Sequence, residues 1–292
     1  MMIDRRTVLL ALPAMSVMPV ITASPAFAQE APPPLASYER ETGGHVGLYA
    51  ENLATGKKIL WRADERFVMC STFKLSLAAL VLSRVDRHQD RLDQMIRFGP
   101  ADLPDWYAPV ARQNLARGEM SIAEMCEAAV EQSDNTCATL LLARVGGPAA
   151  LTAFWRSLGD GTTRLDHGEL QLNRTPLGDP HDTTTPAAMA GSLRQFLFGD
   201  ILSPTSRGLI TGWMLGCKTG DNRLRGGLPK DWRIGDKTGN NGTDAAGDLA
   251  VTWPRSGGPL LICAYTRGGT PSAANLATLF ADIGRLVGEQ LG

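Results

Sequence analysis

The chain has 292 residues, of which 43% are hydrophobic and 20% charged, which is ordinary globular composition. Twenty-nine basic against thirty acidic residues leave a formal net charge of −1, so we expect no nucleic-acid partner. The four histidines are not spaced as a metal-binding cluster, and the five cysteines form no CxxC pair. A His-based metallohydrolase, a zinc site and a disulfide framework are therefore not expected. We predict no metal and no cofactor.

The N-terminus has the pattern of an export signal. A pair of arginines precedes an apolar run over residues 8–21, and residues 26–28 form a small-x-small cleavage signal. We predict that residues 1–28 are a signal peptide, which would place the protein in the periplasm or the medium without a membrane anchor. The twin arginines leave a twin-arginine export route open. An uncleaved anchor is less favoured because prolines interrupt a run already short for a bilayer.

Alternating apolar residues predict strands at both ends of the remaining chain. Tight turns separate these strands, which implies antiparallel pairing. A final segment has apolar residues at helical spacing and predicts an amphipathic helix packed on the sheet. The predicted strands are residues 46–50, 59–61, 232–239, 248–253 and 260–266, and the helix spans about 276–287.

The middle of the chain predicts helices. Residues 75–85 are apolar on nearly all sides, which is typical of a buried helix. Ser121 and Glu124 form a capping box, and Pro186 begins a helix that ends at Gly199. Residues 159–184 show neither helical nor strand periodicity, so we expect a functional loop there.

These patterns predict an α/β (α+β) fold with a five-stranded antiparallel sheet flanked by helices. An all-helical domain is inserted between the second and third strands. We place the sheet domain at residues 29–68 and 214–292, and the helical domain at 69–213.

Ser71 and Lys74 are the first candidate catalytic pair. They are three residues apart at the start of the buried helix, so they share one face. A serine becomes nucleophilic when a neighbour takes its proton, and a buried lysine can do so. The helix N-terminus favours developing negative charge at the serine. A simple N-cap serine beside a surface lysine is the alternative interpretation.

A second hydroxyl group occurs in the sequence Ser133-Asp134-Asn135, between two predicted helices. These residues could simply cap the following helix. In a functional interpretation, Ser133 delivers a proton to a leaving group, and the Asn135 amide holds a substrate carbonyl.

Lys-Thr-Gly occurs twice, at Lys218 and at Lys237. The second copy lies on a predicted strand, where Lys237 and Thr238 project to opposite faces and Gly239 lets a ligand approach the backbone. The first copy lies in a predicted loop. We therefore predict that Lys237 is functional and that Lys218 is not.

These three motifs, in this order, resemble those of the serine β-lactamases and the D,D-peptidases among the penicillin-binding proteins. The resemblance covers nearly the whole chain after the signal. It implies a serine β-lactamase/D,D-peptidase-like fold, a serine acyl-enzyme, a small-molecule β-lactam substrate and a monomer.

The long loop decides the subgroup. Residues 164–182 resemble the Ω-loop of class A β-lactamases, which carries Glu-x-x-Leu-Asn. The match implies that Glu169 is the loop carboxylate and that Asn173 holds its water. A hydrolase needs such a base poised over water, whereas a transpeptidase waits for an amine.

The resemblance implies three further site residues and a second role for Ser71. The backbone N–H groups of Ser71 and Asn240 would form the oxyanion hole. Tyr107 matches the aromatic residue at the cleft mouth, with a half-buried core tyrosine as the alternative. Arg223 matches a guanidinium that binds the substrate carboxylate, with an ordinary surface arginine as the alternative.

The sequence departs from the family pattern in the loop and beside the nucleophile. His167 stands where an arginine commonly pairs with the aspartate that closes the loop, here Asp182. Cys70 precedes the nucleophile, as in class A members with strong carbapenem activity, but Asn241 stands at the partner position, so their disulfide cannot form. These departures concern the range of substrates more than the reaction.

We therefore expect a class A serine β-lactamase (EC 3.5.2.6) that hydrolyses penicillins and cephalosporins, an antibiotic-resistance and β-lactam-catabolism function. The alternatives are a D,D-peptidase or a non-hydrolysing penicillin-binding sensor of the same fold. A generic esterase is disfavoured because the sequence contains no Gly-x-Ser-x-Gly.

Overall fold

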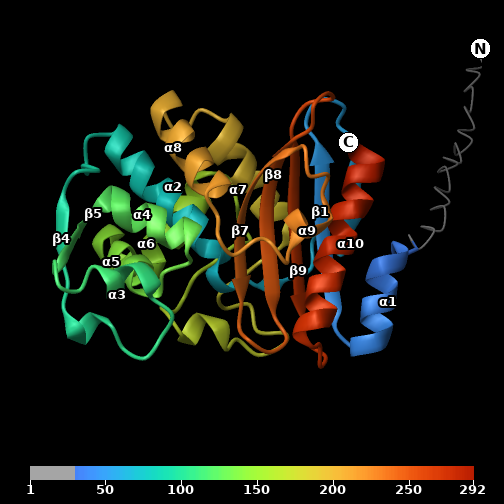
Figure 1. The fold of residues 1–292 in the computed structure, drawn as a ribbon, viewed down its shortest axis with the longest axis horizontal. Helices are drawn as coiled ribbons and strands as arrows, with labels where there is room; N and C mark the ends of the chain where they lie inside the picture. Colours follow the sequence, from blue (N-terminus) through green and yellow to red (C-terminus); the bar gives the residue numbers. More distant parts are fainter. Residues whose placement is uncertain (1–29) are drawn as a thin grey trace, which may run out of the picture. The chain divides into compact units, whose positions relative to one another are not determined.

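Both ends of the chain build one antiparallel sheet of five strands in the order β2-β1-β9-β8-β7 (Figure 1). This computed structural model describes residues 30–292, so the predicted signal peptide lies outside the described residues. All five predicted strands are confirmed, with bounds that differ by a few residues. They are β1 (His45–Asn52), β2 (Lys58–Trp61), β7 (Arg233–Asn240), β8 (Ala246–Trp253) and β9 (Leu260–Arg267).

The sheet is buried on both faces. Alternate residues of β8 belong to two different apolar clusters, with Leu249 and Val251 in one and Ala246 and Ala250 in the other. Successive strand residues point to opposite faces, which explains this division. The outer face is covered by α1 (Pro33–Thr42), α9 (Leu224–Gly227) and the predicted C-terminal helix α10 (Ala273–Leu291), as Figure 1 shows.

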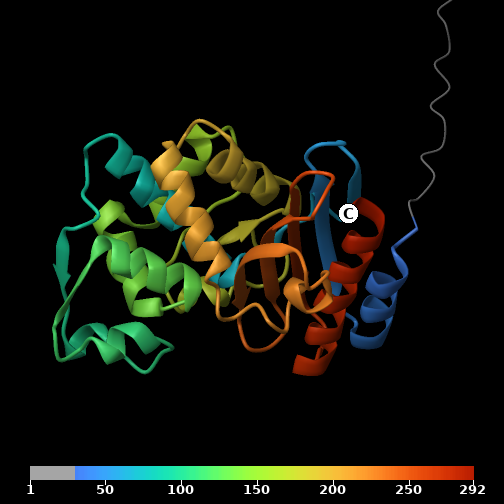
Figure 2. The same cartoon turned by 45° about the horizontal axis from the view of Figure 1, so that its top comes forward.

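The helical half packs around one buried helix, α2 (Phe73–Asp86), which confirms the prediction for residues 75–85. Other helices surround it (Figure 2), because apolar residues occur on nearly all sides of its axis. The other helices are α3 (Pro109–Gln113), α4 (Ile122–Glu131), α5 (Asn135–Val145), α6 (Gly147–Ser157), α7 (Pro186–Phe198) and α8 (Pro204–Leu215).

Local signals set several helix ends as predicted. Ser121 and Glu124 form the capping box of α4, and Thr185 caps α7, which ends before Gly199. The short elements were not predicted, because two or three residues are too few for a periodic pattern. They are the strand pairs β3 (Phe67–Val68) with β6 (Thr183–Thr184) and β4 (Met95–Arg97) with β5 (Glu119–Ser121), and the 3₁₀ turns Cys70–Thr72, Pro100–Asp102 and Gln171–Asn173.

Residues 31–292 form one compact unit, and the proposed division into sheet and helical domains stays a prediction. All five cysteines are buried and free, as expected for thiols that fill apolar space. Within residues 30–292, no single helix has the length and apolar character to cross a membrane, although the bent pair α5 and α6 meets that test by length and composition.

Candidate active site

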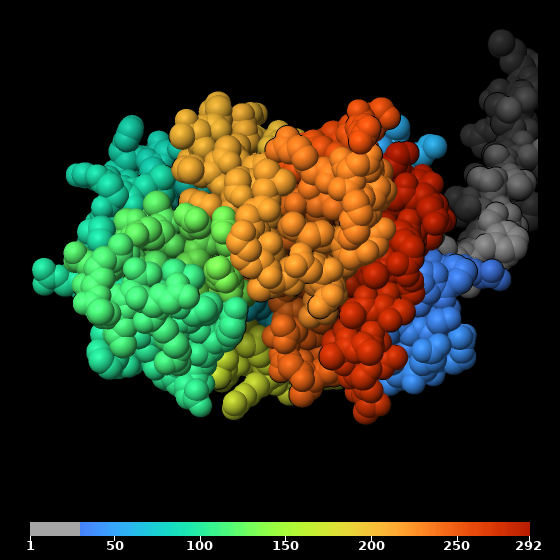
Figure 3. Space-filling view, in the orientation of Figure 1, coloured from blue at the N-terminus to red at the C-terminus, as the bar shows by residue number. Residues whose placement is uncertain are grey.

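A cleft of about 820 Å³ lies between the edge strand β7, the start of α2 and the loop of residues 164–182. Figure 3 shows the face of the molecule on which the helical half (green) and the sheet half (orange) meet. Ten of the predicted site residues line this cleft: Ser71, Tyr107, Ser133, Asn135, Glu169, Asn173, Arg223, Thr238, Gly239 and Asn240. The remaining two, Lys74 and Lys237, lie fully buried beneath them.

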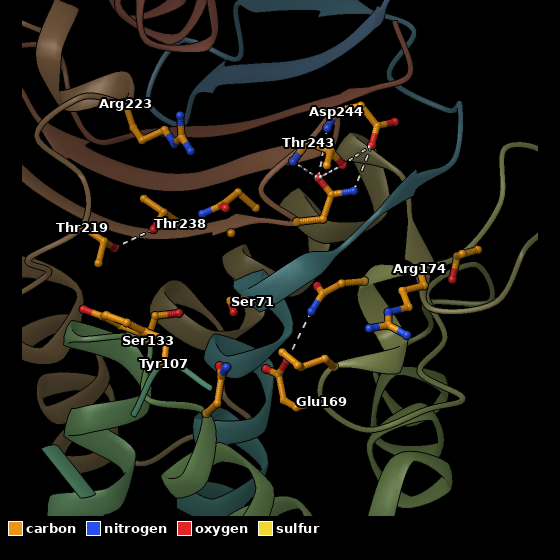
Figure 4. Close-up of a pocket in the computed structure, with 17 residues that line it drawn as sticks. Ser71, Tyr107, Ser133, Glu169, Arg174, Thr219, Arg223, Thr238, Thr243 and Asp244 are labelled. Carbon is orange, nitrogen blue, oxygen red and sulfur yellow. Dashed lines mark hydrogen bonds between the residues drawn. The ribbon is translucent and has the colours of Figure 1, made fainter. Parts of the chain in front are cut away.

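Ser71 lies at the centre of the cleft in the 3₁₀ turn that leads into α2 (Figure 4). The preceding residue, Cys70, has a positive φ of 47°, a conformation that costs a non-glycine residue about 1–3 kcal/mol. Among residues 30–292, the Ser71 hydroxyl has no hydrogen-bond partner, and Lys74 bonds to other oxygen atoms instead. No other side chain therefore holds this hydroxyl away from a substrate bound in the cleft.

Lys74 is held by three oxygen atoms. Its ammonium donates to the Ser133 carbonyl at 2.9 Å and to Asn135 Oδ1 at 2.5 Å. It also lies 3.0 Å from Glu169 Oε1. A buried ammonium needs such partners, because leaving it unpaired costs several kcal/mol. Lys74 thus joins the Ser133 turn to the loop carboxylate.

Lys237 approaches the same turn from the sheet. Its ammonium donates to Ser133 Oγ at 3.0 Å and to the Thr238 carbonyl at 2.7 Å. Burial lowers the pKa of Lys237 to about 7, and the nearby charge of Lys74 lowers it too. Lys237 can therefore change its charge near neutral pH.

Asp134 fixes the turn that carries Ser133. Its carboxylate accepts the N–H of Cys137 at the start of α5, and also the N–H groups of Val110 and Ala111 in α3. Ser133 itself has a positive φ of 58°. The capping role is thus real, and the same contacts hold the turn that carries Ser133 and Asn135.

Glu169 lies on the loop side of Ser71. Its Oε2 accepts a hydrogen bond from Asn173 Nδ2 at 3.3 Å, as the dashed line in Figure 4 shows. Asn173 Oδ1 is buried without a partner among the described residues. A buried amide oxygen of this kind is suited to hold a water molecule beside the carboxylate. The peptide bond between Glu169 and Leu170 is cis.

The neck of the loop is closed by Asp182, which is fully buried. Its carboxylate accepts the N–H groups of Asp166 and His167, and Oδ2 lies 2.7 Å from His167 Nδ1. His167 thus contacts the aspartate that an arginine commonly pairs with in the family pattern. The hydrogen bond to Asp182 raises the pKa of His167 above its ordinary value.

The register of β7 against β8 sets the direction of the Asn240 N–H. Asn241 N donates to the carbonyl of Ala245, in the turn that leads into β8, and Ala246 N donates to the Thr266 hydroxyl on the other side. In an antiparallel ladder such pairs alternate, so Asn240 N points away from β8. Because β7 is the edge strand, this N–H is directed outward, toward the side of Ser71.

Gly239 packs directly against the start of α2. A Cβ atom at this position would lie 2.8 Å from Ser71 N and 2.9 Å from Thr72 N. The strand can approach the start of α2 this closely only because residue 239 has no side chain.

One end of the cleft is suited to an anion. The Thr219 and Thr238 hydroxyls lie 2.5 Å apart, and the Arg223 guanidinium stacks 5.0 Å from the centre of the Phe280 ring. Burial lowers the pKa of Arg223. Sequence reasoning missed Thr219, although it belongs to the first Lys-Thr-Gly copy; the neighbouring Lys218 lies outside the residues that line the cleft.

The opposite end holds polar residues that sequence reasoning also missed. They lie just after Asn173 and Asn240 in the chain. Their closeness in sequence to these two predicted site residues is the signal that could have indicated them. Tyr107 is exposed at the mouth of the cleft. The missed residues are Arg174, Thr175, Asn241, Thr243 and Asp244.

Comparison with known proteins places this geometry in a family. A family model described as "Beta-lactamase enzyme family" matches residues 34–291. Beta-lactamase L2 of Stenotrophomonas maltophilia is 43% identical over 88% of this chain and 84% of its own length. The carbapenem-hydrolyzing beta-lactamase KPC of Klebsiella oxytoca is 40% identical over 89% and 88%.

Solved structures agree with these relatives. An ancestral class A beta-lactamase superposes with a TM-score of 0.84 at 51% identity, covering 87% of this chain and 97% of that one. A beta lactamase from Xanthomonas campestris pv. campestris superposes with a TM-score of 0.86 at 45% identity, covering 89% and 97%.

The close approach at Gly239 generates a prediction. Gly239→Ala should lower the free energy of unfolding by about 1–3 kcal/mol, because the new methyl group meets backbone atoms that cannot yield easily. Gly208→Ala is the matched control, since that glycine lies in α8 with open space around it, and alanine is the better helix former. Urea unfolding of both variants measures the difference. Equal stabilities would contradict the packing described.

Proposed function

The chain belongs to the β-lactamase enzyme family as a class A member, and we propose that it opens the β-lactam ring at the Ser71 hydroxyl and releases the product with Glu169. Hydrolysis of β-lactams is the activity of this family. The single observation that carries our assignment of residues is the position of Glu169, 3.0 Å from the Lys74 ammonium and bonded to Asn173 beside the free Ser71.

Acylation begins with attack of Ser71 Oγ on the ring carbonyl. Two routes for the serine proton fit this site: direct transfer to Lys74 once it is a neutral amine, its own extra proton having passed to the neighbouring Glu169 carboxylate, or transfer to Glu169 through a water molecule. Developing negative charge on the carbonyl oxygen would be stabilised by the N–H groups of Ser71 and Asn240. Ser133, which touches both lysine networks, supplies the proton to the ring nitrogen as the C–N bond breaks.

Deacylation uses the loop. Glu169 takes a proton from a water held with Asn173, and the resulting hydroxide attacks the ester carbonyl. The Ser71 oxygen then leaves and regains a proton. A general base at this position separates a hydrolase from a D,D-peptidase or a sensor that stays acylated, so neither alternative is favoured.

The substrate would bind with its ring carboxylate at the Thr219, Thr238 and Arg223 end, where Lys237 adds positive charge. Its acyl side chain would extend toward Tyr107 and the residues that follow Asn173 and Asn240, with the Asn135 amide near the side-chain carbonyl. We propose that penicillins and cephalosporins are both substrates, since both carry this carboxylate. We further propose an exported, periplasmic or secreted monomer.

Ser71→Ala tests the proposed function. We expect wild-type protein mixed with benzylpenicillin to gain the mass of the drug transiently and then return to its free mass, because turnover regenerates the serine. The alanine variant should gain no mass and hydrolyse nothing. Time-resolved mass spectrometry measures both. A persistent wild-type adduct would indicate a sensor, and an adduct in the variant would place the nucleophile elsewhere.

Glu169→Gln should still form the acyl-enzyme but release it about 10²–10⁴-fold more slowly, because glutamine keeps the shape and loses the base. The decay of the adduct after rapid mixing gives the rate. Glu127→Gln, on α4 and away from the cleft, is the matched control and should leave the rate unchanged. Normal turnover in Glu169→Gln would show that this carboxylate is only structural.

The pKa of Lys237 predicts a pH dependence. Below about pH 7 its ammonium is charged and attracts the substrate carboxylate, and above this value the charge is lost. We therefore expect kcat/KM for benzylpenicillin to fall as the pH rises through about 7, since kcat/KM reports groups of the free enzyme.

Two variants check the origin of this pH dependence. Lys237→Arg should abolish the decline, because a guanidinium stays charged at every pH used. Lys218→Ala should keep the wild-type profile. An identical decline in Lys237→Arg would assign the titration to another group.

A further inference from the structure

His167 and His181 meet outside the cleft, at the two ends of the loop that carries Glu169. Their ring centroids are 6.0 Å apart and the rings are tilted by 56°. Both line a second cavity of about 690 Å³, which adjoins the substrate cleft and shares Glu169, Leu170, Arg174 and Thr175 with its lining. Their side chains are 37% and 44% exposed. The reaction proposed above uses neither imidazole.

Each imidazole is oriented by its own carboxylate. His167 Nδ1 lies 2.7 Å from Asp182 Oδ2, and His181 Nδ1 lies 2.5 Å from Asp179 Oδ1. A carboxylate oxygen only accepts a hydrogen bond, so in the neutral rings Nδ1 carries the hydrogen and the lone pair is on Nε2. Carboxylates bonded to the distal nitrogen in this way accompany most metal-binding histidines and make them better ligands.

The charge around the pair favours a cation. Asp182 and Asp179 are bonded to the two imidazoles, and Asp166 accepts the backbone N–H of Asp182. The Arg164 guanidinium is already paired with Asp166. Arg174 also lines the cavity and makes no ion pair within residues 30–292. With neutral imidazoles, three carboxylates therefore face two guanidinium groups.

We propose that His167 and His181 form a site for one first-row divalent cation, such as Zn²⁺, which joins the two ends of the Glu169 loop. A zinc ion lies about 2.0–2.1 Å from a histidine nitrogen, which puts two ring centroids on one tetrahedral ion roughly 5–6 Å apart. The observed separation of 6.0 Å needs only a small adjustment.

Such an ion would be exchangeable and is not a catalytic metal. Within residues 30–292, no group of three or more His, Cys, Asp or Glu side chains is placed to hold an ion. Water would therefore complete the coordination. The bound ion would hold the two ends of the loop together, because it would link His167 to His181 in addition to the bond between His167 and Asp182. This inference does not depend on the reaction proposed for the cleft.

Zinc titration calorimetry of the processed wild-type enzyme tests the site. We expect one Zn²⁺ per chain at micromolar affinity and at least a tenfold weaker affinity in His181→Ala. This variant keeps the bond between His167 and Asp182, so the loop neck stays closed. His88→Asn, at an exposed histidine elsewhere, is the control and should bind as wild type does. Equal affinities of wild type and His181→Ala, or no binding at millimolar zinc, would overturn the proposal.

Electron paramagnetic resonance with Cu²⁺ supplies an independent readout. One equivalent of Cu²⁺ should show two imidazole nitrogens in wild type and in His88→Asn, and one nitrogen in His181→Ala. A single nitrogen in wild type would refute a shared ion. Thermal melting adds a check on the link across the loop, since Zn²⁺ should raise the Tm of wild type and leave that of His181→Ala nearly unchanged.

Discussion

The site depends on the burial of two lysine ammonium groups. Lys74 and Lys237 have no exposed surface. A buried charge must find polar partners, because its desolvation costs several kcal/mol. Both lysines reach the turn at Ser133, one through its carbonyl and one through its hydroxyl. The turn therefore joins the helical half to the sheet, and Asp134 holds it in place through three backbone N–H groups.

The same constraint gives the site its chemistry. Lys74 also touches Glu169, so the loop carboxylate, the turn and the start of α2 belong to one network. On the sheet side, burial keeps the pKa of Lys237 near 7. Groups that can donate or accept a proton thus surround Ser71. The Ser71 hydroxyl itself makes no hydrogen bond in the described part of the chain.

Contacts at the neck of the loop also affect the position of Glu169. Asp182 closes its neck with two backbone N–H groups and one imidazole. The proposed ion between His167 and His181 would act on this same neck, on the side away from the substrate. The position of Glu169 would then depend on contacts outside the cleft, which links the stability of the loop to the deacylation step.

The sequence by itself determined the features that are local in the chain. Periodicity predicted the five strands and the buried helix α2, and short motifs located Ser71, Ser133, Lys237 and the caps, because caps and amphipathic faces depend on residues a few positions apart. The tertiary structure alone decided the rest. The outward N–H of Asn240 follows from strand register, Thr219 meets Thr238 through packing, and His167 meets His181 because the loop returns to its own start. Contacts of this kind join residues that lie far apart in the chain. Periodic patterns and short motifs relate only residues a few positions apart, so they could not predict these contacts.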